Sequence, residues 1–196
     1  MKNSIQSTLK ETANILDAFI SDDNNIQKIA SAVEIMATSL KNGRKIIACG
    51  NGGSLCDATH FCEELTARFR KNRRALSAIA INDSAFITCA VNDFDAQDVF
   101  ARYVEAVGNT GDVLLAISTS GNSENILRAS KLAREMGMKV VALTGKTGGK
   151  LGEFADVEIR APYSEYSDRA QEIHIKVIHI LVQEIENLLI YNKQGE

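Results

Sequence analysis

Two side chains with metal-binding chemistry stand four residues apart in the first third of the chain. His60 and Glu64 lie in a segment with helical spacing, so a helix would place both on one face, within about 40° of each other. An imidazole nitrogen and a carboxylate oxygen at that spacing can bind one metal ion together. The same pair is also common as a surface ion pair. The spacing alone therefore leaves both interpretations open.

The other candidates for such a site lie near the end of the chain. Gln171, His174 and His179 fall in a segment expected to form one long helix. Gln171 and His179 would be about 12 Å apart along a straight helix and about 80° apart around it. A single ion lies about 2 Å from each donor. Either both side chains stretch toward the ion, or the helix bends, or two chains share the ligands.

A turn rich in hydroxyl groups indicates a second kind of chemistry. Residues 118–123 read STSGNS and separate an apolar run from a segment with helical spacing. Four hydroxyls exceed what a helix N-cap needs, because one side chain fills that role. Hydroxyls and free backbone N–H groups at a helix N-terminus suit a phosphate group. We predict a phosphate-binding turn, with helix capping alone as the alternative.

Two glycine-rich segments have different interpretations. Residues 49–54, CGNGGS, also join an apolar run to a helical segment and are a candidate phosphate or sugar loop. They are not a dinucleotide fingerprint, because Leu55 occupies the third glycine position, and a tight turn without ligand is the alternative. Residues 144–150 lack the spacing of a nucleotide-binding P-loop, because Lys150 stands where the second glycine belongs. We interpret them as an ordinary loop.

Short apolar runs and helical segments alternate along the chain. The predicted strands are residues 45–49, 76–81, 113–117, 140–143 and 157–159. The segments with helical spacing between them are residues 54–69, 95–107 and 124–136. This alternation predicts a five-stranded parallel sheet with helices on both faces, a three-layer α/β/α sandwich.

The two ends of the chain are expected to be helical. Residues 4–19 and 25–40 are amphipathic and predict an N-terminal helical hairpin. Residues 166–191 predict a long C-terminal helix whose apolar residues exceed one face, so we expect a subunit interface there. The 196 residues fit one domain, with the hairpin in residues 1–42 and the α/β core and C-terminal helix in residues 43–196.

Composition narrows the function classes. The 45% apolar and 24% charged residues indicate a folded protein, and the net charge of −3 gives no general attraction to nucleic acid or to anionic membranes. No signal peptide or apolar run of about 20 residues is present in the sequence, so we expect a cytoplasmic protein. The four cysteines form no C-x-x-C pair and are expected to be reduced. The basic run 68–74 is interpreted as a solvated helix end.

Several of these segments together resemble one family. Residues 49–54, 57–65, 118–123 and 168–174, with His179, resemble the bacterial phosphoheptose isomerases of the sugar isomerase (SIS) superfamily. The resemblance extends over nearly the whole chain. The serine-rich turn alone indicates only the superfamily, whereas His60 and Glu64 combined with Gln171 and His179 are much more specific.

The resemblance implies a flavodoxin-like sheet and a homotetramer with active sites at subunit interfaces. It implies one Zn²⁺ per subunit, with the ligands His60, Glu64, Gln171 and His179. The implied substrate-binding residues are Asn51, Gly52, Gly53, Ser54, Glu64, Arg68, Asn92, Asp93, Ser118, Thr119, Ser120, Ser123, Asp168 and Gln171.

The implied activity is the conversion of sedoheptulose 7-phosphate to D-glycero-D-manno-heptose 7-phosphate, the first step toward the heptose of lipopolysaccharide. A ketose–aldose isomerisation through an enediol needs a base at carbon and proton transfer among the oxygens. Glu64 and His179 are the predicted acid–base pair, and which of them acts as acid or base stays open. The alternatives are a non-catalytic SIS protein that binds the replication initiator and an isomerase of another phosphosugar.

Overall fold

A computed structural model describes residues 1–191 of the chain, so residues 192–196 of the predicted single domain lie outside the described residues. The described strands form one parallel sheet in the order β2-β1-β3-β4-β5. They are β1 (Ile46–Gly50), β2 (Ala78–Ala80), β3 (Val113–Ser118), β4 (Lys139–Thr144) and β5 (Val157–Arg160). The five predicted strands are therefore confirmed, although β2 is shorter than the apolar run that predicted it.

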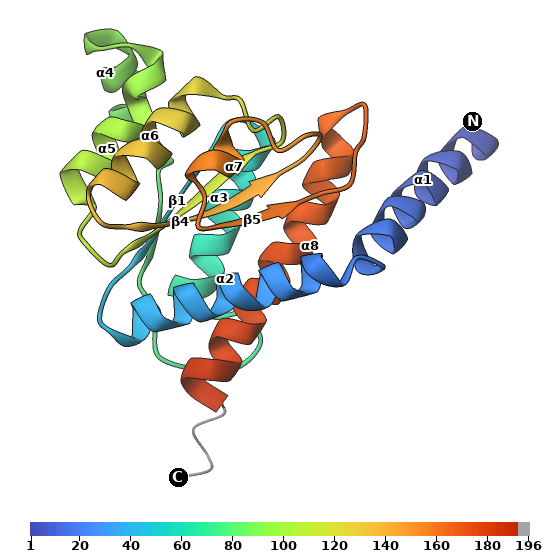
Figure 1. The fold of residues 1–196 in the computed structure, drawn as a ribbon, viewed down its shortest axis with the longest axis horizontal. Coiled ribbons are helices and arrows are strands. Elements are labelled where there is room, and N and C mark those ends of the chain that lie inside the picture. Colours follow the sequence, from blue (N-terminus) through green and yellow to red (C-terminus); the bar gives the residue numbers. More distant parts are fainter. Residues whose placement is uncertain (192–196) are drawn as a thin grey trace.

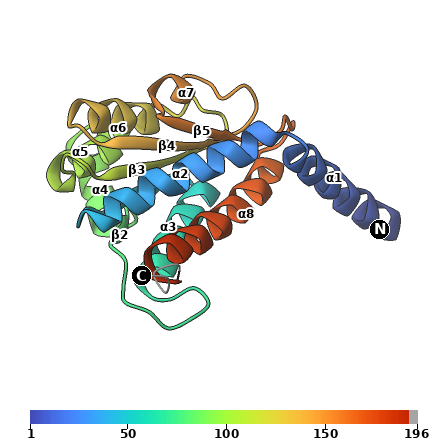
Figure 2. The same cartoon turned by 60° about the horizontal axis from the view of Figure 1, so that its bottom comes forward.

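Helices cover both faces of this sheet (Figures 1 and 2). One face carries α2 (Asp23–Lys41), α3 (Gly53–Thr66) and α8 (Ser167–Glu186); the other carries α4 (Ser84–Asp93), α5 (Val99–Val107), α6 (Glu124–Glu135) and the short α7 (Leu151–Phe154). The predicted three-layer α/β/α sandwich is confirmed.

The core follows from the alternation of side chains along buried strands. In β1, Ile46 and Ala48 join the apolar cluster beneath α2, α3 and α8, whereas Ile47 and Cys49 join the cluster on the opposite face. Every residue of β1 and β3 is buried. Strands apolar on both faces are typical of a parallel sheet between two helix layers.

Several boundaries differ from the prediction. The segment expected to be helical over 95–107 starts with a 3₁₀ turn, Ala96–Asp98, before α5. Two short helices, α4 and α7, were not predicted; α4 begins where the Asp83 side chain accepts a hydrogen bond from the Phe86 N–H. The helix expected over 54–69 ends at Thr66, so the basic run 68–74 lies in a loop and not at a helix end.

The two N-terminal helices are present, but they do not pack as the predicted hairpin. α1 (Lys2–Ile20) points away from the body of the molecule, whereas α2 lies along the sheet (Figures 1 and 2). Phe19 is the only buried residue of α1. Ile15 and Leu16 pack partly buried against the core, whereas Ile5 and Leu9, nearer the N-terminal end of α1, are exposed.

Most of the apolar surface of α8 is buried within its own chain. Ile173, Val177 and Leu181 belong to the cluster shared with α2, α3 and the sheet. Ile180 and Leu188, the latter in the π-helical turn Asn187–Tyr191 that follows α8, are 41% and 45% exposed. Intrachain packing therefore explains much of the apolar excess that suggested an interface. Among the described residues, no helix is long and apolar enough to span a membrane.

Candidate functional site

The strand order places a crevice at the carboxyl ends of β1 and β3. β1 pairs with β2 on one side and β3 on the other, and the helices that follow β1 and β3 cover opposite faces of the sheet. Open α/β sheets bind ligands at such a switch point. Gly50 pairs with Ile117 in the β1–β3 register, so the glycine-rich and serine-rich turns start side by side. These are the two turns that the sequence singled out.

The hydroxyls of the serine-rich turn are not used to cap α6. Ser123 occupies the N-cap position, but its side chain makes no capping hydrogen bond. Its hydroxyl instead accepts a hydrogen bond from the Ser118 hydroxyl, at 3.2 Å, and the Ser120 Oγ accepts one from the Asn122 N–H, at 3.1 Å. The surplus of hydroxyls that motivated the phosphate prediction is thus not explained by helix capping.

A reciprocal amide pair joins the two turns. The Asn51 Nδ2 donates to the Asn125 Oδ1 and the Asn125 Nδ2 donates to the Asn51 Oδ1, both at 3.0 Å. The Asn125 Oδ1 also accepts the Ile126 N–H at the start of α6. Because Asn125 is an ordinary polar residue on a helix, its spacing gave no signal for this role.

Three of the four predicted metal ligands come together between α3 and α8. The His60 Nε2 lies 3.3 Å from the Glu64 Oε1 and 3.3 Å from the His179 Nε2. One ligand atom from each of the three residues falls within 4.8 Å of the others. Two imidazole nitrogens and a carboxylate oxygen that converge in this way can hold a divalent cation such as Zn²⁺. We call these residues the His–Glu–His triangle.

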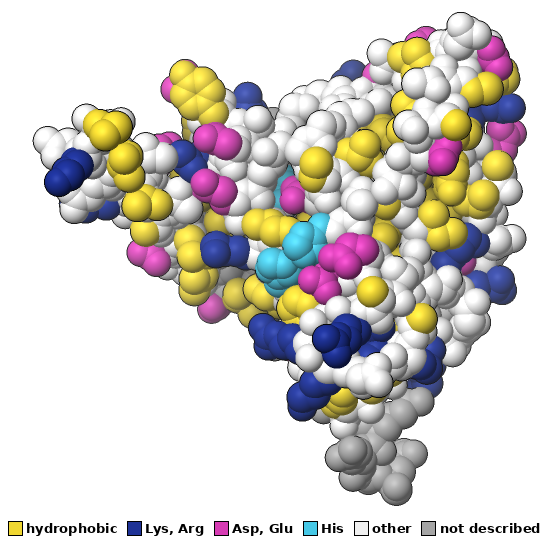
Figure 3. All heavy atoms as spheres, turned by 180° about the vertical axis from the view of Figure 1, so that it is seen from behind, with side chains coloured by type: hydrophobic (Ala, Val, Ile, Leu, Met, Phe, Trp, Pro, Cys, Tyr) yellow, Lys and Arg dark blue, Asp and Glu magenta, His cyan; other side chains and the backbone are white. Residues whose placement is uncertain are grey.

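The surroundings of His179 favour its neutral form. Burial and the neighbouring His60 lower the pKa of His179, and the positive charges of Arg70 and Lys176 lower it further. The negative charge of Glu64 acts in the opposite direction. A neutral imidazole has a free lone pair for a metal ion or a proton. The exposed histidine surface lies beside acidic side chains and above a group of Lys and Arg side chains (Figure 3).

An aromatic ring supports His179 from the loop after α3. Phe69 stacks on His179 with ring centroids 5.8 Å apart, and the Arg70 guanidinium lies 4.9 Å from the centre of the Phe69 ring. Both residues belong to the basic run 68–74 that was predicted to be a solvated helix end. Their role depends on a contact between segments more than 100 positions apart, so local spacing could not show it.

Gln171, in the first turns of α8, has its side chain against Gly53, where α3 begins. A side-chain carbon at Gly53 would lie 2.7 Å from the Gln171 Nε2, so a larger residue there would displace the Gln171 side chain. Gln171 and His60 also line one open cavity of about 440 Å³, together with Asp57 and Asp168. His60 is therefore the member of the His–Glu–His triangle that shares this cavity with Gln171.

Asp57 is a half-buried carboxylate that lines this cavity and was not predicted as a site residue. Its Oδ2 is buried without a hydrogen-bond partner among the described residues. Burial raises its pKa to about 6, and the nearby His60 acts in the opposite direction. Asp57 precedes His60 by three residues on α3, so its position on the same helix face was the available signal.

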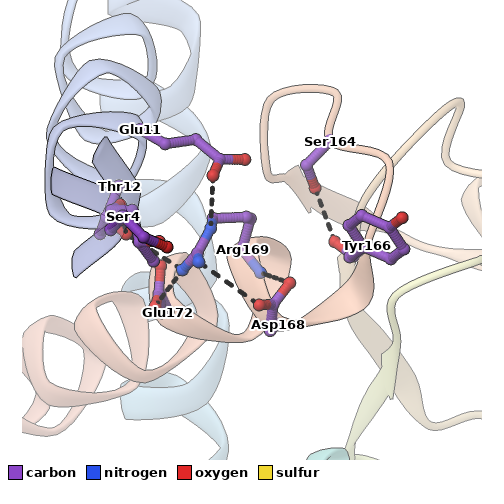
Figure 4. Close-up of polar contacts among 9 residues, drawn as sticks. Ser4, Glu11, Thr12, Ser164, Tyr166, Asp168, Arg169 and Glu172 are labelled. Carbon is purple, nitrogen blue, oxygen red and sulfur yellow. Dashed lines mark hydrogen bonds and ion pairs between the residues drawn. The ribbon is translucent and has the colours of Figure 1, made fainter. Parts of the chain in front are cut away.

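Asp168 lies in a polar cluster that joins α8 to α1 (Figure 4). Its Oδ1 accepts the Arg169 N–H at 2.9 Å, and the Arg169 Nη2 lies 3.5 Å from its Oδ2. The Arg169 guanidinium also bonds Glu172 and the Thr12 hydroxyl, and its Nε lies 3.5 Å from Glu11. Arg169 thus contacts both carboxylate oxygens of Asp168, which lines the cavity.

Three predicted substrate-binding residues are not joined to this site within the chain. Arg68 is exposed in the loop after α3. Asn92 and Asp93 end α4, on the opposite face of the sheet, where the Asn92 Nδ2 donates to the Asp93 Oδ1 at 2.8 Å. The predicted residues of the glycine-rich turn lie beside the crevice. Gly52 is the N-cap of α3, with φ +55°, and Ser54 is buried.

Comparisons with known proteins agree with this geometry. The SIS domain family matches residues 9–145. The chain is 57% identical to a phosphoheptose isomerase of Haemophilus ducreyi, over 93% of this chain and 94% of that protein, and 57% identical to one of Escherichia coli, over 95% and 97%. A solved phosphoheptose isomerase from Neisseria gonorrhoeae superposes with a TM-score of 0.89 at 36% identity, covering 95% of this chain and 98% of that one. The chain therefore belongs to the phosphoheptose isomerases of the SIS-domain family.

Proposed function

We propose that this chain isomerises sedoheptulose 7-phosphate to D-glycero-D-manno-heptose 7-phosphate in the β1–β3 crevice. The observation that carries the proposal is the convergence of His60, Glu64 and His179, in a chain that also has a turn whose hydroxyls are not used for capping. The relatives are named phosphoheptose isomerases, and this favours an isomerase over a non-catalytic SIS protein that binds the replication initiator. An isomerase of another phosphosugar is separated by product analysis.

The two turns bind the remote end of the sugar in this proposal. Ser118, Thr119, Ser120 and Ser123 bind the phosphate with their hydroxyls and backbone N–H groups. The second turn contacts the sugar phosphate through Asn51, Gly52, Gly53 and Ser54. Binding energy from the phosphate holds the reacting carbons in place, which raises the rate of the proton transfer.

Glu64 and His179 transfer the protons. The Glu64 carboxylate removes a proton from C1, and the electrons of that C–H bond form the C1=C2 double bond of the enediol while O2 gains a proton. The enediol then takes a proton at C2, loses one from O1 and becomes the aldose. His179, favoured as the neutral imidazole by its surroundings, carries the proton between the two oxygens.

The same residues would hold one Zn²⁺ per subunit. His60, Glu64 and His179 supply two nitrogens and one oxygen, and Gln171 is the proposed fourth ligand. When bound, zinc polarises the substrate carbonyl and stabilises the negative charge of the enediolate. Glu64 is less basic as a zinc ligand, so its two roles compete.

We propose a cytoplasmic homotetramer with active sites at subunit interfaces. Support comes from the exposed apolar side chains of α1, Ile5 and Leu9, and from Ile180 on α8. Asn92 and Asp93 are exposed and bond each other. In this arrangement they bind substrate at a site completed by a neighbouring subunit.

The test is turnover of sedoheptulose 7-phosphate, followed by NMR of the heptose 7-phosphate product, with added zinc and after chelation. Glu64→Gln should lower kcat by about 100- to 10,000-fold, because it removes the base, while binding of inorganic phosphate is retained. The matched control is Glu63→Gln, which changes an exposed neighbour outside the triangle and should keep the wild-type kcat. A near-normal kcat in Glu64→Gln would refute the assignment of Glu64, and loss of turnover on chelation would support the zinc role.

A further inference from the structure

One residue of the basic run 68–74 is buried beside the proposed active site. The Arg73 side chain is 1% exposed and its Nε lies 2.7 Å from the Glu186 Oε1, whose side chain is 3% exposed. Arg73 belongs to the loop after α3, and Glu186 ends α8. The interpretation of this run as a solvated helix end is therefore wrong for Arg73.

Arg73 also bonds the last turn of α3. Its Nη2 donates to the backbone carbonyl of Glu64 at 2.6 Å, and its Nη1 donates to the carbonyl of Ala67 at 2.9 Å. The final carbonyls of a helix have no partner within the helix, and α3 ends at Thr66 without a glycine cap. The planar guanidinium thus caps the turn that carries the proposed catalytic carboxylate.

The Arg73–Glu186 pair is the last of three contacts that run along α3 and α8. Gln171 meets α3 at Gly53, His179 meets His60, and Glu186 meets Arg73 at the end of α3. His179 precedes Glu186 by seven residues, two helical turns, so the two side chains lie near one face of α8. The pair therefore fixes the separation of the helices next to the His–Glu–His triangle.

The same guanidinium holds the loop that carries Phe69. Arg73 bonds the loop backbone at Ala67 and Arg74. Phe69, between these two points, stacks on His179. The guanidinium thus restrains both the backbone of Glu64 and the ring that packs on His179.

We infer that Arg73, paired with Glu186, is a positioning residue for the isomerisation: it sets the distance between Glu64 and His179 without touching substrate. The inference rests on the proposed function. A displacement of about 1 Å in a reacting group can cost about 100-fold in rate. A purely structural pair would change stability alone, so the two roles make different predictions.

The test compares three variants with the wild-type protein. Arg73→Lys keeps the charge but loses the fork of donors. The double variant Arg73→Met with Glu186→Leu leaves no unpaired buried charge, so its packing can be retained. The control is Lys45→Met with Asp112→Asn, which breaks another ion pair, partly buried, at the amino ends of β1 and β3, away from the crevice.

The measurements are kcat and KM for sedoheptulose 7-phosphate, Zn²⁺ affinity by chelator competition and the thermal midpoint. Arg73→Lys and the double variant should lose about 10- to 100-fold in kcat and in Zn²⁺ affinity, with KM nearly unchanged. The control should lose thermal stability but keep the wild-type kcat and Zn²⁺ affinity.

Folded Arg73 variants with wild-type kcat would overturn the inference, as would a loss of kcat that only follows the folded fraction. If the double variant does not fold, Arg73→Lys decides between these outcomes by the same criteria. A wild-type protein that does not turn over the substrate would refute the proposed function itself. An active wild type with unchanged Arg73 variants would refute only the positioning role.

Discussion

His174 should make the stability of this protein depend on pH. The ring is fully buried on α8, and its Nε2 lies 2.8 Å from the carbonyl oxygen of Thr144, at the end of β4. Its Nδ1 is buried without a partner among the described residues, so the neutral ring donates from Nε2. Burial lowers its pKa from 6.5 to about 4, while the bond to Thr144 opposes the change.

The sign follows from where each state binds a proton. The unfolded chain protonates His174 near pH 6.5, whereas the folded protein resists protonation until about pH 4. The contribution of His174 to stability is therefore complete above pH 6.5 and is lost as the pH falls through this window. At about 1.4 kcal/mol per pKa unit, the loss is about 3 kcal/mol over the whole window.

The comparison variant is His174→Gln, because an amide N–H can still donate to the Thr144 carbonyl but does not titrate. Urea unfolding at pH 7.5 and pH 4.5, at one protein concentration, gives the free energy of unfolding of each protein. Acidification should destabilise the wild type by about 2.5 kcal/mol more than the variant. The other titratable groups are the same in both proteins. Equal losses in the free energy of unfolding would therefore refute the role of His174.

Two further substitutions test local features of the site. Asp57→Asn should stabilise the metal-free protein at pH 8 by about 1–2 kcal/mol after allowance for solvent screening. Because folding raises the pKa of Asp57 to about 6, the gain in the free energy of unfolding should disappear by pH 4. An equal gain at both pH values, measured by urea unfolding, would contradict this expectation. Gly121→Ala should displace the serine-rich turn and weaken inorganic phosphate binding, because the new carbon would lie against the Gly148 carbonyl oxygen at a residue with φ +65°. Gly43→Ala is its control, because Gly43 has φ +73° and free space around it. Backbone strain should cost both variants about 1–2 kcal/mol in thermal unfolding. Calorimetric titration should show weaker phosphate binding by Gly121→Ala alone.

Much of the fold was predictable because its signals are local. The strands of a parallel sheet are buried on both faces, so β1 and β3 appear in the sequence as short continuous apolar runs. The two polar turns were predictable because parallel strands end at one edge of the sheet. Short helices such as α7, with four residues, contain too little periodicity to be detected.

The predicted N-terminal hairpin failed for a different reason. The apolar stripe of α1 predicts that this helix packs on something, but the stripe does not say on what. Within the chain, Arg169 contacts Glu11 and Thr12 of α1 (Figure 4), and the C-terminal part of α1 packs on the core, but Ile5 and Leu9 stay exposed. Amphipathicity predicts a helix face, and the partner of that face depends on tertiary or quaternary structure.

The arrangement of the metal ligands shows the same limit most clearly. The separation of Gln171 and His179 along one helix posed a geometric difficulty that spacing could not resolve. α3 and α8 meet in register, with Gln171 at Gly53 and His179 at His60, so the two residues contact different levels of α3. Gly53 precedes His60 by seven residues, about 10 Å along the helix. The compact unit is therefore the His–Glu–His triangle, and Gln171 shares a cavity with one of its members, His60. Three convergent ligands leave one position of a tetrahedral zinc site for the proposed fourth ligand, Gln171, which would reach it across the cavity that it shares with His60.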